Sequence, residues 1–236
     1  LELLLEGSGD SDVDATDSAT ITIGAGTTTI ASNANQTFTV GDSATGAENI
    51  VITYQGGTPT ITSGNDIRVF IPSTFDMEWD TSDTSVTITG TGSSKVNTTT
   101  VTFDDAKTVV IGVTSDFAAT DAITVAGLTF KNFTSAEAAD KLELDVDNNG
   151  GSDASDAQTV TINAGTTTLS SNANQTFTVG DGATAISPIT VTWLGASPAV
   201  TAANDIRIRI PSGFDMVWDS SDTAATITGT GSAKVS

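Results

Sequence analysis

The twelve residues DVDNNGGSDASD (145–156) carry oxygen-bearing side chains at the spacing of a calcium-binding loop. If Asp145 is position 1, a glycine falls at position 6, where an EF-hand loop turns sharply, and oxygen ligands fall at positions 1, 3, 5, 7, 9 and 12. The closing residue is Asp rather than Glu, and the flanking segments have the pattern of strands rather than helices. The segment nevertheless predicts a Ca²⁺ site made by Asp145, Asp147, Asn149, Gly151, Asp153 and Asp156.

A second acidic segment, EGSGDSDVDATD (6–17), lies 139 residues upstream. It keeps oxygen-bearing side chains at most of the ligand positions, although the residues between those positions differ from the ones in 145–156. The alternative interpretation of both segments is a solvated linker that charge keeps unfolded. Mutual repulsion of clustered carboxylates favours a bound cation over a bare loop. The ligands predicted for the upstream segment are Glu6, Ser8, Asp10, Asp12, Asp14 and Asp17.

The overall charge narrows the classes of partner. Lys and Arg total 8 against 29 Asp and Glu, which gives a formal charge of -21. Such a chain has no basic surface for nucleic acid phosphates or for anionic lipid. It contains no cysteine and no histidine, so disulfides, zinc–thiolate sites and histidine general bases are excluded. No apolar run approaches the length of a membrane span.

The elements around the acidic loops belong to an internal repeat. Residues 21–42 recur as 160–181 with 18 of 22 positions identical, and residues 65–97 recur as 204–236 with 24 of 33 identical. Both matches have an offset of 139 residues, so we expect a tandem repeat of that period. The second copy has no counterpart of residues 98–144 and is incomplete in this sequence.

Most segments alternate apolar and polar residues with a period of two, which predicts half-buried strands. Ile67, Val69 and Ile71 form one such apolar face. Only TSAEAADK (134–141) has the pattern of a helical turn. The sequence therefore predicts an all-β fold, with each copy an antiparallel, immunoglobulin-like β-sandwich of two sheets.

These features predict four regions. Residues 1–17 hold the closing strand of a preceding repeat and an acidic linker, and 18–144 form the first sandwich. Residues 145–156 form a calcium-type linker, and 157–236 form a second sandwich that lacks its C-terminal strands.

The segments IRVFIPSTFDMEWD (67–80) and DFAATDAITVAGLTF (116–130), together with the acidic junctions, resemble a broad family. This family comprises the tandem immunoglobulin-like or cohesin-like repeats of prokaryotic cell-surface proteins, including adhesins and surface-layer proteins. The resemblance implies an extracellular, non-enzymatic protein.

We therefore expect a structural protein of a surface layer, sheath or filament, with Ca²⁺ stiffening the joints between repeats. Its partners would be copies of itself or neighbouring repeats, which complete each sandwich by strand addition. The strand expected at LELLLEG would expose an apolar face and an unpaired edge if left free, and it supplies the candidate assembly residues Leu1, Leu3 and Leu5. The alternative is an adhesin or carbohydrate-binding module on a surface stalk, in which Trp79 or Trp218 would stack on a surface glycan.

Overall fold

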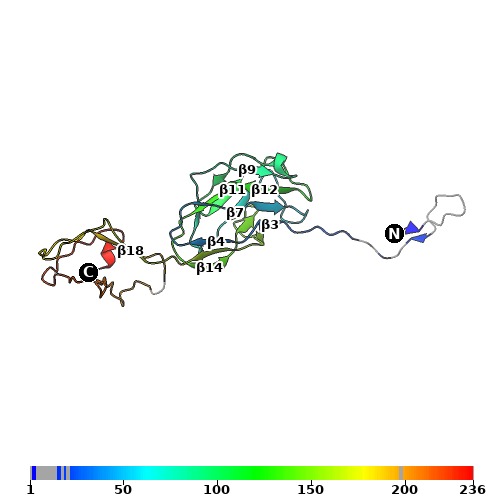
Figure 1. The fold of residues 1–236 in the computed structure, drawn as a ribbon. Coiled ribbons are helices and arrows are strands. Elements are labelled where there is room, and N and C mark those ends of the chain that lie inside the picture. The colour runs from blue at the N-terminus through cyan, green and yellow to red at the C-terminus, as the bar shows by residue number, and fades with distance from the viewer. Residues whose placement is uncertain (1, 4–14, 17–18, 20–21, 197–198, 236) are drawn as a thin grey trace.

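A computed structural model describes residues 2–3, 15–16, 19, 22–196 and 199–235 of the chain. Within these residues the protein is all-β, apart from two short 3-10 turns, η1 (Ser93–Lys95) and η2 (Ser232–Lys234). Nearly all packed structure lies in one β-sandwich-like body, residues 26–163, which we call the first body (Figure 1).

Two larger sheets make the main layers of the first body. One sheet has the order β10 (Thr102–Phe103), β11 (Thr108–Ile111), β7 (Ile67–Phe70), β15 (Glu143–Asp145) and β16 (Ala154–Ser155). The other has the order β3 (Thr29–Ser32), β6 (Ile50–Thr53), β12 (Ala122–Ala126) and β9 (Thr87–Thr89).

Two three-stranded sheets complete the first body. One contains β5 (Thr45–Gly46), β13 (Thr129–Lys131) and β8 (Glu78–Trp79). The other contains β14 (Glu137–Asp140), β17 (Val160–Asn163) and β4 (Gln36–Thr39). Outside the first body are two hairpins, β1 (Glu2–Leu3) with β2 (Ala15–Thr16) and β18 (Thr168–Ser171) with β19 (Ile189–Thr192).

The core forms because the period-two alternation turns one face of each strand inward. On β7, Ile67 and Val69 are buried, whereas Arg68 and Phe70 are only partly covered, so the apolar face predicted from the sequence is confirmed. Aromatic rings add to the core at β4, β8 and β13. The Phe38 ring stacks on Phe133 at 4.4 Å between centroids, and Trp79 stacks on Phe130 at 4.5 Å.

The predicted helical turn at 134–141 is wrong. Residues Glu137–Asp140 form strand β14, which pairs antiparallel with β17 through Glu137 opposite Ile162 and Asp140 opposite Val160. Good helix formers such as Ala and Glu therefore give way to a tertiary partner that local propensity does not register.

One pairing of named strands departs from the antiparallel pattern. Strand β17 runs parallel to β4, with Val160 opposite Gln36 and Ile162 opposite Phe38. The first strand of the second copy thus lies between two strands of the first copy, at the edge of the first body from which the chain continues to β18 (Figure 1).

Candidate functional site

The acidic segment 145–156 is held by a hairpin of the first body. Strands β15 and β16 pair antiparallel, with Glu143 opposite Ser155 and Leu144 opposite Ala154. The loop between them turns at Asn148 (φ 60°) and Gly150 (φ 81°), both in the left-handed region that Asn and Gly tolerate best.

Three carboxylates converge in this loop. Asp145, Asp147 and Asp153 each offer one oxygen, and these oxygens lie within 4.8 Å of one another. Asp145 is 2% exposed and accepts hydrogen bonds from the backbone N–H groups of Asn148 (2.7 Å) and Gly150 (2.9 Å). Asp153 accepts one from the Val146 N–H at 2.8 Å. Asp147 accepts the Asn149 N–H at 3.1 Å, so the loop backbone holds all three side chains.

The donor set suits a hard divalent cation. Calcium binds oxygens at about 2.3–2.6 Å, so two oxygens on one ion lie at most about 5 Å apart, and the spacing of the three carboxylates meets that limit. Asp145 Oδ1 accepts two backbone N–H groups, from Asp147 and Asn148. The Oδ2 atoms of Asp145 and Asp153 accept one N–H each and retain a second lone pair for a metal. The neighbouring cation Arg68, opposite Asp145 on β7, is paired through its Nε with Asp104 at 2.7 Å.

Other predicted ligands are placed differently. The Asn149 side-chain oxygen accepts the Gly151 N–H at 2.6 Å, inside the same loop. Asp156 is outside the carboxylate group: it is 1% exposed and accepts the Ser32 N–H at 2.8 Å and the Ser32 hydroxyl at 2.5 Å. Its carboxylate thus fixes the end of β3 rather than closing the acidic loop.

The upstream group of predicted ligands and part of the assembly strand lie outside the described residues. These are Glu6, Ser8, Asp10, Asp12, Asp14 and Asp17, together with Leu1 and Leu5. Leu3 is described through its backbone, which pairs with Ala15 in the β1–β2 hairpin.

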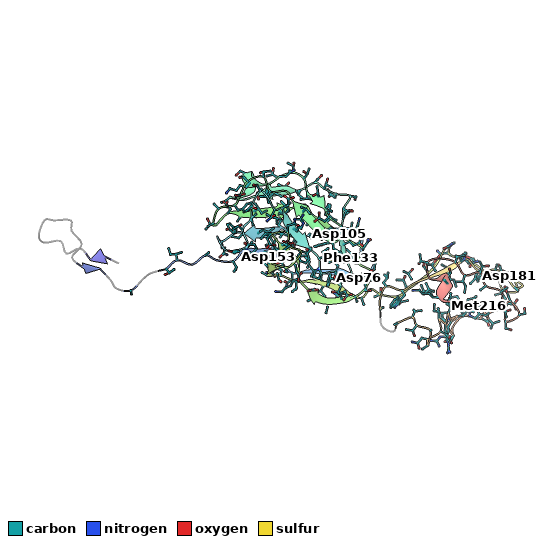
Figure 2. The ribbon with its side chains drawn as sticks, turned by 180° about the vertical axis from the view of Figure 1, so that it is seen from behind. Asp76, Asp105, Phe133, Asp153, Asp181 and Met216 are labelled. Atoms are coloured by element: carbon teal, nitrogen blue, oxygen red, sulfur yellow. The ribbon has the colours of Figure 1, made fainter. Side chains whose placement is uncertain are left out.

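The structure places the expected linker 145–156 inside the first body. Both of its flanking strands belong to the five-stranded sheet, and the chain remains in the first body through β17. Figure 2 shows Asp153 on the side of the first body from which the N-terminal segment leaves, while Asp76 and Phe133 lie nearer the second copy. The acidic loop is therefore not the joint with residues 164–235.

The joint lies instead at the end of β17. The Val40 N–H donates to the Asn163 carbonyl at 2.9 Å, within the first body, and the Gly165 N–H donates to the Leu194 carbonyl at 2.6 Å, within the second copy. Only Ala164 separates these two anchors. A Cβ on Gly165 would meet the Leu194 Cβ at 2.5 Å and the Val40 carbonyl oxygen at 3.0 Å, so the two copies approach closely here.

We call the space between β4 and β14 that β17 fills the receiving slot. Val160 is 7% exposed in it and Ile162 is 1% exposed. Two hydrogen bonds hold the residue that precedes β17. The Gln36 N–H donates to the Thr159 carbonyl, and the Thr159 N–H donates to the Asn35 side-chain oxygen, each at 2.9 Å.

The second copy shows what the fold loses without its later strands. Residues 164–235 leave exposed most of the described apolar side chains whose counterparts are buried in the first body. Ile206 is 46% exposed against 0% for Ile67, and Trp218 is 46% exposed against 0% for Trp79. The cause is topological. In the first body β7 pairs with β11 and β15 on its two sides, and β8 pairs with β13, but the sequence here contains no counterpart of β11, β13 or β15.

The sequence does not point to two residues that make contacts described above, Ser32 with Asp156 and Leu194 with Gly165. Ser32 and Leu194 have no chemical signature, since one is a serine among many and the other a leucine after a tryptophan. Leu194 packs against the core of the first body although it belongs to the second copy. The one hint in the sequence is position along the chain, because Ser32 ends β3 and Asp156 directly follows β16.

The remaining acidic groups act as turn caps and ion pairs. The Ser82 hydroxyl and then Lys131 lower the pKa of Asp80, and a Lys95 hydrogen bond at 2.6 Å is the main cause of the lowered pKa of Asp121. Burial lowers the pKa of Lys107, whose ammonium donates to the Phe75 and Met77 carbonyls. These partners are those expected of structural charges.

Comparison with protein-family models, curated proteins and solved structures returns no match for this chain. Among the described residues, no helix has the length and apolar character needed to cross a membrane.

Proposed function

We propose that the chain is a structural, non-enzymatic repeat protein of the cell exterior, in which consecutive immunoglobulin-like sandwiches of 139-residue period build a filament, sheath or surface layer. The supporting observation is the parallel strand β17, which belongs to the second copy by sequence and to the first body by pairing. A strand shared in this way makes each body depend on the next copy and leaves little free chain between them.

The charge and composition agree with this role. A chain with a net charge of -21 and no cysteine or histidine resists aggregation and carries no redox-sensitive thiol. Trp79 has no exposed surface, so the first body does not present it to a sugar ring. Its counterpart Trp218 is 46% exposed, in a second copy whose sequence here has no counterpart of β13, the strand that pairs with β8 beside Trp79. We therefore favour the structural role over an adhesin.

Calcium binding at Asp145, Asp147 and Asp153 is a second element of the proposal. A divalent ion offsets the repulsion among three convergent carboxylates and fixes the hairpin that leads the chain from β15 towards the shared strand. In this arrangement the ion stabilises the first body and acts on the joint only through β16 and β17.

Single-molecule force spectroscopy of the full chain tests the structural proposal. If the first body ends at Asn163, its unfolding releases residues 26–163, about 500 Å of contour at about 3.6 Å per residue. A body that ended at 144 would release only about 430 Å. The shorter step would contradict strand sharing, and electron microscopy without ordered polymers at any protein or Ca²⁺ concentration would contradict the assembly role.

The calcium proposal has its own test. Thermal melting of the full chain in Ca²⁺ and in EDTA should show stabilisation by the ion, following the ratio of Ca²⁺ to its Kd. Asp147→Asn should remove the shift. Asp105→Asn, which alters an exposed carboxylate that only caps Lys107, should keep it. Equal melting in Ca²⁺ and EDTA would refute the site.

A further inference from the structure

The strand that fills the receiving slot has a counterpart at the start of the first copy. Residues 156–163 (DAQTVTIN) match residues 17–24 (DSATITIG) at the same offset of 139, and Ile162 falls on Ile23. The element just before this segment is also matched, because β16 (Ala154–Ser155) falls on β2 (Ala15–Thr16). In both copies a short strand therefore directly precedes this segment, although the partner of β2 is Glu2–Leu3, two residues before the counterpart of the β15 residues that pair with β16.

The two counterparts have opposite environments. Ile162 is 1% exposed between β4 and β14, whereas Ile23 is 96% exposed. Among the described residues, Thr22, Ile23 and Gly24 have no hydrogen-bond partner. An extended segment with an apolar residue in water and an unpaired backbone is the state of a β-strand without its sheet.

The chain leaves both segments in the same way. The Gly26 N–H donates to the Gln55 carbonyl at 3.0 Å, as the Gly165 N–H donates to the Leu194 carbonyl at 2.6 Å. Gly26 is as closely packed as Gly165, since a Cβ on it would lie 2.8 Å from the Gln55 Cβ. Each copy thus anchors the same glycine and projects the preceding strand away from itself. The contact differs in one respect, because Gln55 replaces the apolar Leu194.

We propose that residues 22–24 are a donor strand that inserts into the receiving slot of another copy of this β-sandwich, parallel to its β4 and antiparallel to its β14. Ile23 occupies the position that Ile162 holds here, against Phe38 of the accepting copy. The inference deepens the proposed structural role and rests on it: strand sharing then operates at both ends of the first body, and the partner is the same fold.

A strand-replacement variant of the full chain tests whether the sequence fits the slot. Four substitutions, A157S, Q158A, V160I and N163G, give residues 156–163 the sequence of 17–24. The melting temperature of the first body should stay within about 4 °C of the parent protein. A fall as large as that of Ile162→Asp would overturn the proposal.

A second experiment tests whether the strand is donated between chains. Ile162→Asp should expel β17 and open the slot, and the full-length variant should then self-associate in sedimentation velocity through residues 22–24. The double variant Ile23→Asp/Ile162→Asp should sediment as a monomer. Equal association of both variants would overturn donation by this strand.

Synthetic peptides keep the test decisive if Ile162→Asp folds poorly. A peptide of residues 15–26 added to that variant should raise its melting temperature as a peptide of residues 154–165 does, and the 15–26 peptide with Ile23→Asp should not. Rescue by 154–165 alone would overturn the inference while leaving strand sharing intact. An Ile162→Asp variant that melts like the parent would instead refute the proposed strand sharing itself.

Discussion

Truncating Ile162 to Ala measures how much the first body depends on the second copy. The side chain is 1% exposed, so the substitution removes three buried carbons. At about 0.8 kcal/mol for each carbon the transfer cost is about 2.4 kcal/mol, and the residual cavity brings the expected loss to about 3–4 kcal/mol. This is a large share of the stability of an ordinary domain.

Tryptophan fluorescence isolates the relevant transition. Trp79 is buried in the first body, whereas Trp193 and Trp218 are 45% and 46% exposed in the second copy. In a W193F/W218F background, urea denaturation followed at Trp79 therefore reports the first body alone.

The matched control for this substitution is Ile23→Ala. It alters the same position of the other copy on a 96% exposed residue and should change the unfolding free energy by less than about 0.5 kcal/mol. If Ile162→Ala also costs less than about 0.5 kcal/mol, β17 does not stabilise the first body and the reasoning fails.

Three further outcomes are expected. Asp147→Asn should abolish the difference between melting in Ca²⁺ and in EDTA, because it removes one of three convergent charges. The pKa of Asp121 is lowered in the folded state by Lys95, so this pair stabilises the protein above the unfolded pKa of about 3.9 and the contribution is lost on acidification. Asp121→Asn should therefore lower the unfolding free energy at pH 7 by about 1 kcal/mol and leave it unchanged near pH 2; equal losses at both pH values would contradict this. Ser32→Ala removes a hydroxyl donor from a buried carboxylate and should cost about 1–2 kcal/mol, whereas Ser171→Ala at the exposed matching position should cost nothing measurable in the same urea titration.

Local patterns in the sequence are sufficient for strands such as β7 and for the convergence of carboxylates in the acidic loop. The alternation of Ile67 and Val69 with polar residues identifies β7 because burial on one face imposes a period of two. The spacing of Asp145, Asp147 and Asp153 brings their carboxylates together because the loop backbone bonds to them directly.

Long-range pairings were beyond that reasoning. Strand β17 pairs with β4 across more than a hundred residues, and the alternation of Val160 and Ile162 says only that one face is buried, not by which body. The same limit explains Asp156, which the spacing assigns to the loop but whose carboxylate accepts the Ser32 hydroxyl. Local propensity does not identify strand β14, because its alanines and acidic residues favour a helix and only the pairing with β17 makes the segment a strand.

The shared strand separates the unit of inheritance from the unit of folding. A gene that gains or loses 139-residue segments by unequal crossing-over adds or removes an acceptor and a donor together, wherever within the period the break falls. Every internal domain of the product then remains supplied with its last strand. The number of domains can therefore change between generations without a new contact surface having to evolve.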